Sequence, residues 1–117
     1  MNVNEFITNL VLDASLLVGN PNGNCILLGC KEWKEYVDGK ATGNTIGIKA
    51  NVGCPKNMYQ TLEGIKIKGA KMNFTNEQLR EKGGQPIVLK GLQGKFYRDN
   101  TGEYKLSCTA DGFEVVS

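Results

Sequence analysis

Apolar and polar residues alternate with a period of two along most of the chain from residue 24 onward, which predicts strands buried on one face. The clearest case is residues 45–52, where Ile46, Ile48, Ala50 and Val52 alternate with polar or small residues. The same alternation predicts further strands at 27–37, 61–68, 85–93 with a continuation to 98, and 104–110, and a closing extended segment at 113–116. We therefore expect an all-β protein.

One short helix interrupts this pattern at 75–82. Thr75 is a good N-cap, Gln78 occupies the capping-box position, and two glycines follow as a stop. Turns between the strands are expected at Asn20-Pro21-Asn22-Gly23, at Asp38-Gly39 and at 99–102. The predicted order is three strands, the helix, and then two strands.

The first twenty residues fit two structures. A helix would place on one face Phe6, Ile7, Leu10, Val11 and Ala14. The run 10–18 could equally be a strand. Because the segment lacks a strong helix stop and its apolar, β-branched mix suits a sheet, we expect a strand. Residues 1–23 are thus predicted to be an N-terminal extension or extra strand on a single domain, 1–117, whose barrel spans 24–117.

This order of elements is that of the OB-fold, a five-stranded, partly open Greek-key barrel. The position of the helix is the informative part, since in that fold a helix between the third and fourth strands plugs the bottom of the barrel. We therefore expect a five-stranded OB-fold barrel with one short helix, 75–82, between strands 3 and 4.

Basic residues are concentrated in the middle of the chain. The whole sequence has 14 Lys and Arg against 12 Asp and Glu, a net charge of +2. All 14 basic residues lie within 31–105, against 8 acidic ones, so this region carries +6. Such a distribution suits an anionic partner.

Binding a single nucleic-acid strand without reading its sequence needs cations that follow the phosphates and flat side chains on which bases stack. The predicted strands interleave both kinds of residue. The candidate nucleic-acid-binding residues are Lys31, Trp33, Lys34, Tyr36, Lys49, Lys66, Lys68, Lys95, Tyr97 and Arg98. Trp33 could equally pack in the core of the sheet. Phe96, Tyr104 and Phe113 are in phase with apolar neighbours and are expected in the core.

Catalysis and metal binding have little support in the sequence. There is no histidine, and no C-x-x-C pair joins the four cysteines Cys25, Cys30, Cys54 and Cys108. We expect these cysteines to be reduced, buried thiols. The acids Glu32, Glu35 and Asp38 are spaced among lysines, as on a solvated hairpin. We therefore expect no enzyme activity and no cofactor.

Two segments resemble the small OB-fold single-stranded-DNA-binding proteins encoded by phages, plasmids and conjugative elements of Gram-positive bacteria, including lactococcal phages. These are KEWKEY at 31–36 with its hairpin, and QPIVLKGLQGKFY at 85–97. The resemblance covers most of 24–116. The chain stops at 114–117 without the flexible acidic tail through which bacterial replication-type binders recruit partners, which is typical of the phage type.

The resemblance implies sequence-independent binding that protects single-stranded DNA during replication or recombination of a phage or mobile element. A homo-oligomer, a dimer or tetramer, is expected because one such barrel engages only about 4–16 nucleotides, and recombination or replication proteins are further expected partners. The alternative is a β-barrel interaction or structural module of a phage that binds no nucleic acid. Residues 1–30 lack Lys and Arg and no apolar run approaches the about 20 residues that span a bilayer, so we expect the cytoplasm of a bacterial host and no membrane contact.

Overall fold

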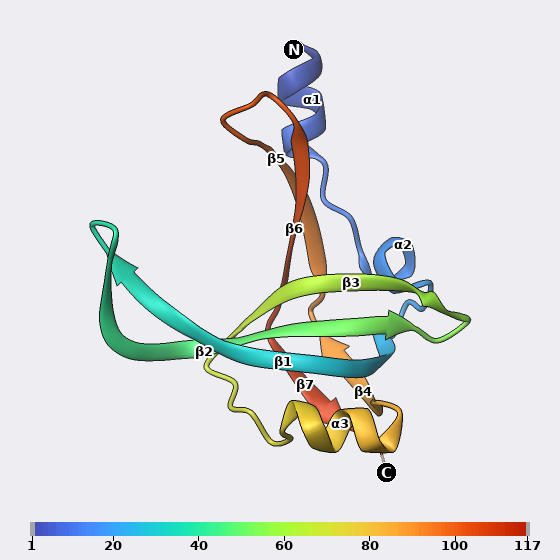
Figure 1. Cartoon of the computed structure of the whole chain (residues 1–117). Helices are drawn as coiled ribbons and strands as arrows, with labels where there is room; N and C mark the ends of the chain where they lie inside the picture. The colour runs from blue at the N-terminus through green and yellow to red at the C-terminus, as the bar shows by residue number, and fades with distance from the viewer. Residues whose placement is uncertain (1, 117) are drawn as a thin grey trace.

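The computed structural model describes residues 2–116, which form mostly strands with three short helices (Figure 1). In chain order the elements are α1 (Val3–Asn9), α2 (Ala14–Val18), β1 (Asn24–Val37), β2 (Lys40–Cys54), β3 (Asn57–Lys68), α3 (Asn76–Lys82), β4 (Gln85–Lys90), β5 (Gln93–Arg98), β6 (Tyr104–Ala110) and β7 (Gly112–Val115). The all-β prediction is confirmed.

The strands form one curled sheet in the order β5-β6-β3-β2-β1-β4-β7. Its pairings are antiparallel except for β3 with β6, which is parallel. Only Asp111 separates β6 from β7, although β6 pairs with β3 and β7 lies at the far edge beside β4. The sheet must therefore curl until its two sides meet at this residue.

The expected count of five strands is wrong, because the structure has seven strands within residues 2–116. The expected strand 85–98 is divided into β4 and β5 by a bend at Gly91, which has a φ of 63° and whose added Cβ would lie 2.2 Å from the Asp111 carboxylate. The closing segment expected at 113–116 is a strand of its own, β7, which Asp111 separates from β6. A tightly curled sheet requires such bends, and glycine permits them.

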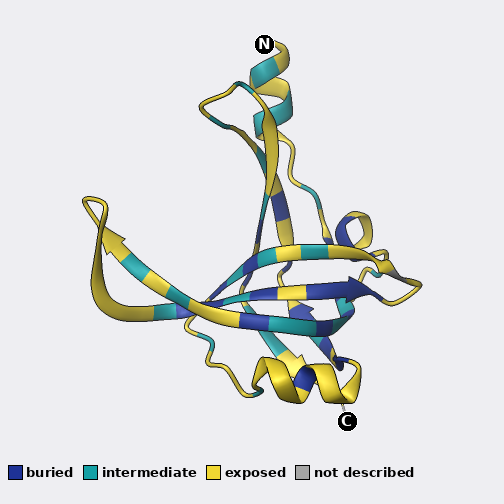
Figure 2. Cartoon of the chain, viewed as in Figure 1, coloured by how far each residue is buried: buried dark blue, intermediate teal, exposed yellow. Residues whose placement is uncertain are grey.

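The interior of the curl is the hydrophobic core, seen as dark blue segments in Figure 2. Its centre is built from β2 and β3, where Ala50, Val52, Ile65 and Ile67 are fully buried. All four cysteines are buried and unpaired, as predicted. Burial raises the pKa of Cys25 to about 12, with a smaller contribution from the neighbouring Cys54, so this thiol stays protonated.

The expected helix is present as α3. The Thr75 hydroxyl accepts a hydrogen bond from the Gln78 backbone, and the Gln78 side chain accepts one from the Thr75 backbone, so the capping box is complete. Gly83 ends the helix in the left-handed conformation. Leu79 is 1% exposed and points into the core, which places α3 across one end of the curled sheet.

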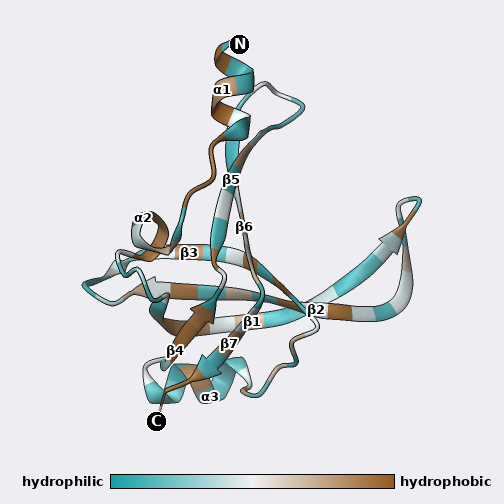
Figure 3. Ribbon diagram, turned by 180° about the vertical axis from the view of Figure 1, so that it is seen from behind, coloured by the Kyte–Doolittle hydropathy of each residue, from teal (hydrophilic) through white to brown (hydrophobic). Residues whose placement is uncertain are grey.

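The strand expected in the first twenty residues is wrong, because the segment forms α1 and α2. Each helix has a side-chain N-cap: Asn2 accepts a hydrogen bond from the Glu5 backbone, and Asp13 accepts one from the Leu16 backbone. These local caps outweigh the strand preference of the apolar run. Figures 1 and 3 both show α1 beside the hairpin of β5 and β6.

The three aromatic residues expected in the core differ in how far they are buried. Phe96 and Phe113 are half-buried, whereas Tyr104 is 37% exposed, so its core assignment is wrong. The reason is that the β5–β6 hairpin projects beyond the body of the sheet (Figure 1), where no opposing layer covers it fully. Across residues 2–116, no helix has the length and apolar character needed for crossing a membrane.

Candidate nucleic-acid interface

Three lysines stand side by side on neighbouring strands. The antiparallel registers pair Lys31 of β1 with Lys49 of β2, and Lys49 with Lys66 of β3. Directly paired residues share a face of the sheet, with Cβ atoms about 5 Å apart, and like charges in such pairs destabilise it. Within residues 2–116 none of the three forms an ion pair. The row is therefore a concentration of positive charge without an internal counter-charge.

The same face continues onto the next two strands. Lys66 pairs with Thr109 of β6, and Thr109 pairs with Gln93 of β5. Alternation along the hairpin then places on this face Lys95 and Tyr97 of β5 and Lys105 and Ser107 of β6. We call this surface, from Lys31 across to the β5–β6 hairpin, the basic face. It lies opposite the buried residues of the same strands.

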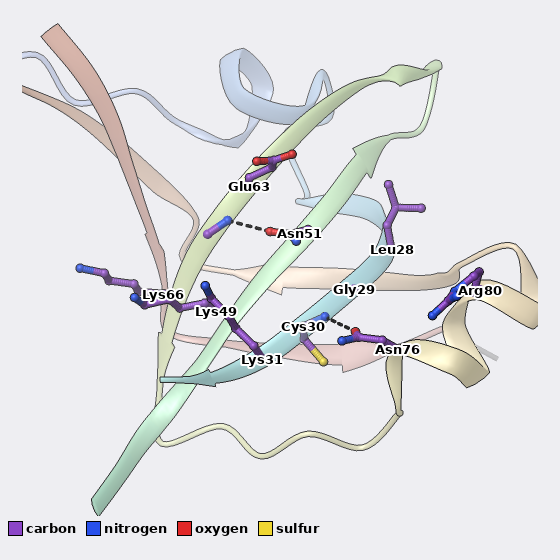
Figure 4. Close-up of a pocket in the computed structure, with 11 residues that line it drawn as sticks. Leu28, Gly29, Cys30, Lys31, Lys49, Asn51, Glu63, Lys66, Asn76 and Arg80 are labelled. Atoms are coloured by element: carbon purple, nitrogen blue, oxygen red, sulfur yellow. Dashed lines mark hydrogen bonds between the residues drawn. The ribbon is translucent and has the colours of Figure 1, made fainter. Parts of the chain in front are cut away.

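A groove of about 560 Å³ opens on the basic face between β1, β2, β3 and α3. Arg80 of α3 and the three lysines of the row line it, and Glu63 is the one acidic residue among its lining residues. Figure 4 shows the lysines toward one end of the groove and Arg80 at the other, with Asn51 between them. The groove thus offers cations at both ends.

Two asparagine side chains fix the backbone of the groove. The Asn51 carboxamide oxygen accepts a hydrogen bond of 2.9 Å from the Gly64 backbone, at a point where β3 bulges and Gly64 has a φ of 70°. The Asn76 oxygen accepts one of 2.8 Å from the Cys30 backbone (Figure 4). The second bond ties the first turn of α3 to β1, and it thereby positions Arg80 one turn further along the helix.

Replacing Asn76 with alanine is expected to lower the free energy of unfolding by about 1–2 kcal/mol, because the partly buried Cys30 amide loses its acceptor. Chemical denaturation followed by fluorescence measures this change. Asn73→Ala is the matched control, since Asn73 is exposed in the loop before α3. Equal stability of the two variants would contradict this role for Asn76.

Trp33 is half-buried and lies next to Lys66, which lines the groove. It is two residues from Lys31, so it shares the basic face, and it pairs with Gly47 on β2. The Lys66 ammonium lies 5.5 Å from the centre of its ring, within the range of a cation–π contact. Trp33 is therefore neither sealed in the core nor isolated from the lysines.

Three of the remaining candidates lie on the arms that project from the sheet, and one lies beside Trp33. Tyr36 is 66% exposed near the tip of the β1–β2 hairpin, and Tyr97 is 48% exposed on the β5–β6 hairpin. Lys68 pairs with Gly47, which places it in the row of Trp33. Lys95 is exposed on the basic face of β5.

Two candidates are held away from the basic face. The Lys34 ammonium contacts Glu32 at 2.6 Å and donates to the Thr45 hydroxyl at 2.9 Å, on the opposite side of β1 from Lys31. Arg98 donates from Nε to the Gly102 carbonyl, and its guanidinium lies 5.9 Å from the centre of the Tyr104 ring. The structure does not bring these two side chains to the lysine row.

Three residues of this surface were missed from the sequence. Arg80 reaches the groove only through the packing of α3, which no local pattern predicts. Asn51 could have been found, because it alternates in phase with Lys49. Lys105 could have been found, because it alternates in phase with Ser107 and Thr109. Its ammonium lies 3.3 Å from Asp99, whose pKa is lowered first by the hydrogen bond from the Thr101 hydroxyl. Lys105 is thus already partly neutralised.

Comparison of the chain with protein-family models, with curated proteins and with solved structures gives no match. The family resemblance of residues 31–36 and 85–97 therefore stays a prediction.

Proposed function

We propose that the protein binds single-stranded DNA along the basic face without reading its sequence. The observation that carries this proposal is the row Lys31, Lys49 and Lys66. Within residues 2–116 no acidic side chain forms an ion pair with these lysines, and the Trp33 ring lies next to Lys66. Phosphates would supply the missing counter-charge, and the ring would supply a stacking surface for a base.

The chemistry of the surface favours a sequence-independent partner. Lysine ammonium groups are flexible point charges, whereas reading base edges relies on fixed, bidentate groups such as arginine or a carboxamide. The groove has two carboxamides, those of Asn51 and Asn76. The oxygen of each already accepts a hydrogen bond from the protein backbone. The row is thus suited to the phosphate backbone, which is the same for every sequence.

The strand pairings support an OB-fold interpretation of the curled sheet. If β4 with β5 and β6 with β7 are each counted as one bent strand, five strands remain, and α3 lies between the third and fourth. The β1–β2 and β5–β6 hairpins project in two directions from the body of the sheet (Figure 1). In the OB-fold the corresponding loops flank the surface that binds oligonucleotides.

The biological setting we propose is protection of single-stranded DNA during replication or recombination of a phage or mobile element, in the cytoplasm of its bacterial host. One barrel covers about 4–16 nucleotides, so protection of a longer strand requires many copies.

Titration with fluorescently labelled oligo(dT), duplex DNA and RNA at two salt concentrations tests the proposal. We expect oligo(dT) to bind more tightly than the duplex, with an affinity that falls as salt rises, because counterions are released on binding. No binding of oligo(dT) at low salt would overturn the proposal and favour a protein-interaction module. Tighter binding of RNA than of oligo(dT) would overturn the choice of DNA.

Trp33→Ala is expected to weaken oligo(dT) binding by roughly 5- to 150-fold, the equivalent of about 1–3 kcal/mol for one lost base stack. In the unchanged protein, the same stack should quench the fluorescence of Trp33, the only tryptophan. Trp33→Phe is the control, because it keeps a flat ring and should retain most of the affinity. Unchanged affinity of Trp33→Ala, in a variant shown by circular dichroism to be folded, would refute the stacking role.

A further inference from the structure

Arg80 brings a positive charge of α3 into the groove, at the end opposite the lysine row (Figure 4). Its side chain is exposed, and within residues 2–116 it forms no ion pair. This holds although Glu63 lines the same groove and two acids, Glu77 and Glu81, lie on the same helix. The other arginine of the chain, Arg98, is bonded to the carbonyl of its own hairpin. The Arg80 guanidinium is therefore free to bind an anion in the groove.

The Asn76 side chain adds a hydrogen-bond donor on the same side of α3. Asn76 lies four residues before Arg80, so the two side chains are neighbours on one face of the helix, and both line the groove. The Cys30 backbone N–H donates to the Asn76 side chain at 2.8 Å. Because an N–H group can only donate, the carboxamide oxygen must face it and the amino group is turned the other way.

The Asn51 carboxamide is oriented in the same manner. Its oxygen accepts from the Gly64 backbone N–H at 2.9 Å, which leaves its amino group as a second donor in the groove. Figure 4 shows this side chain between the lysines and Arg80. The lysine row and α3 are thus connected by groups that donate hydrogen bonds.

Gly29 of β1 lies between the two carboxamides. A Cβ added at this position would lie 3.3 Å from the Asn76 oxygen and 3.9 Å from the Asn51 amino nitrogen. Because glycine has no side chain there, a ligand can approach the backbone between the two asparagines. The groove therefore stays open along its length from the row to Arg80.

The lining of the groove selects the chemistry of its ligand. Its volume of about 560 Å³ is within the range of about 300–1,000 Å³ that is typical of ligand sites. Its charged and amide groups offer donors, and Glu63 is the one carboxylate among them. A phosphodiester group carries acceptor oxygens and no donor, whereas a peptide brings N–H donors of its own. The planar fork of a guanidinium also matches two phosphate oxygens at once.

We propose that the bound strand continues from the lysine row through the groove to α3, where Arg80 and the Asn76 amino group hold one of its phosphates. This inference rests on the proposed function and extends it, because it makes α3 part of the DNA-binding surface. Asn76 then has two roles: its oxygen fixes α3 to β1, and its amino group contacts the strand.

Titration of Arg80→Gln with fluorescently labelled oligo(dT) tests the phosphate contact. We expect binding about 5-fold weaker at ~0.1 M salt, and a slope of log affinity against log salt that is smaller by about 0.7, the values for one phosphate contact on a single strand. Arg98→Gln is the matched control, since it removes the same charge from a side chain held away from the lysine row. It should bind oligo(dT) nearly as tightly as the unchanged protein.

Asn76→Asp tests the amino group separately from the fold. The substitution keeps an oxygen for the Cys30 amide and replaces the amino donor with a negatively charged oxygen, so the variant should fold and bind oligo(dT) at least about 5-fold more weakly. Asn73→Asp is the control, because it adds the same charge in the exposed loop before α3, outside the lining of the groove. It should bind almost as the unchanged protein does.

The outcomes separate this inference from the proposed function. If the unchanged protein binds oligo(dT) but Arg80→Gln binds it as tightly as Arg98→Gln, or Asn76→Asp as tightly as Asn73→Asp, the contact at α3 is wrong and DNA binding on the sheet stands. If the unchanged protein does not bind oligo(dT), both proposals are wrong. Circular dichroism of each variant shows whether a loss of binding occurs in a folded protein.

Discussion

Replacing Lys31, Lys49 and Lys66 together with glutamine is expected to weaken oligo(dT) binding about 100-fold at ~0.1 M salt. Each phosphate contact on a single strand contributes about 0.7 to the slope of log affinity against log salt, so losing three contacts should reduce that slope by about two. Fluorescence titrations at four or more salt concentrations give both quantities.

The same variant should be as stable as the unchanged protein or more stable. Its three substitutions remove two pairs of directly opposed like charges, Lys31 with Lys49 and Lys49 with Lys66. The two charges of each pair repel each other in the free protein. Weaker DNA binding with unchanged or increased free energy of unfolding is the result expected of a binding surface. A purely structural role for the lysines predicts a loss of both.

A matched control is Lys56, Lys71 and Lys90 replaced together with glutamine. These lysines are exposed and none of them lines the groove; the ion pair of Lys90 with Glu114, at 3.5 Å, lies on the surface. The net charge changes by the same amount in both variants. Equal weakening of DNA binding would mean that total charge matters and the row does not, and it would contradict the proposed site.

Gly47→Ala is expected to lower the free energy of unfolding by about 3 kcal/mol, at the upper end of the cost of overpacking. A Cβ at this position would lie 2.1 Å from the Ile67 carbonyl oxygen and 3.0 Å from the Lys68 Cα. These are backbone atoms, which no side-chain rotation can move aside. The strands β2 and β3 would have to separate between Gly47 and Lys68, next to Trp33 of β1. Denaturant unfolding measures the loss.

Gly112→Ala is the control for this prediction. Gly112 has no atom within 4 Å of the position of an added Cβ, and its φ is not in the left-handed region. Its substitution should change the free energy of unfolding by less than about 0.5 kcal/mol. Similar values for the two variants would show that β2 and β3 can separate at Gly47 without cost.

Local patterns predicted the elements that depend on neighbouring residues. Asp38 and Gly39 have φ values of 52° and 78°, so they form the tight turn that their residue types favour. The second strand begins directly after this turn, at Lys40, and so is longer than the alternation at 45–52 indicated. The N-terminal helices were also locally encoded, by the caps Asn2 and Asp13, and the error lay in giving the apolar run more weight than these caps.

The sequence predicted which types of residue form the candidate site more accurately than it predicted on which face of a strand each side chain lies. Alternation along a strand already places Lys31 and Trp33 on one face and Lys34 on the other. In the structure Lys34 contacts Glu32, away from the lysine row. The prediction grouped all of these residues in one segment, and the period of the strand would have separated them.

The sequence by itself determined that the chain is mostly β, where α3 begins and ends, and where the charge lies, because alternation, capping and turn preference act between residues a few positions apart. Only the tertiary structure decided that Lys31, Lys49 and Lys66 form one row, that Arg80 faces them across a groove, and that several apolar side chains of α1 and α2 stay exposed. These features depend on strand register and on packing between segments distant in the chain. A shift of one residue in register would have turned any of these lysines to the other face.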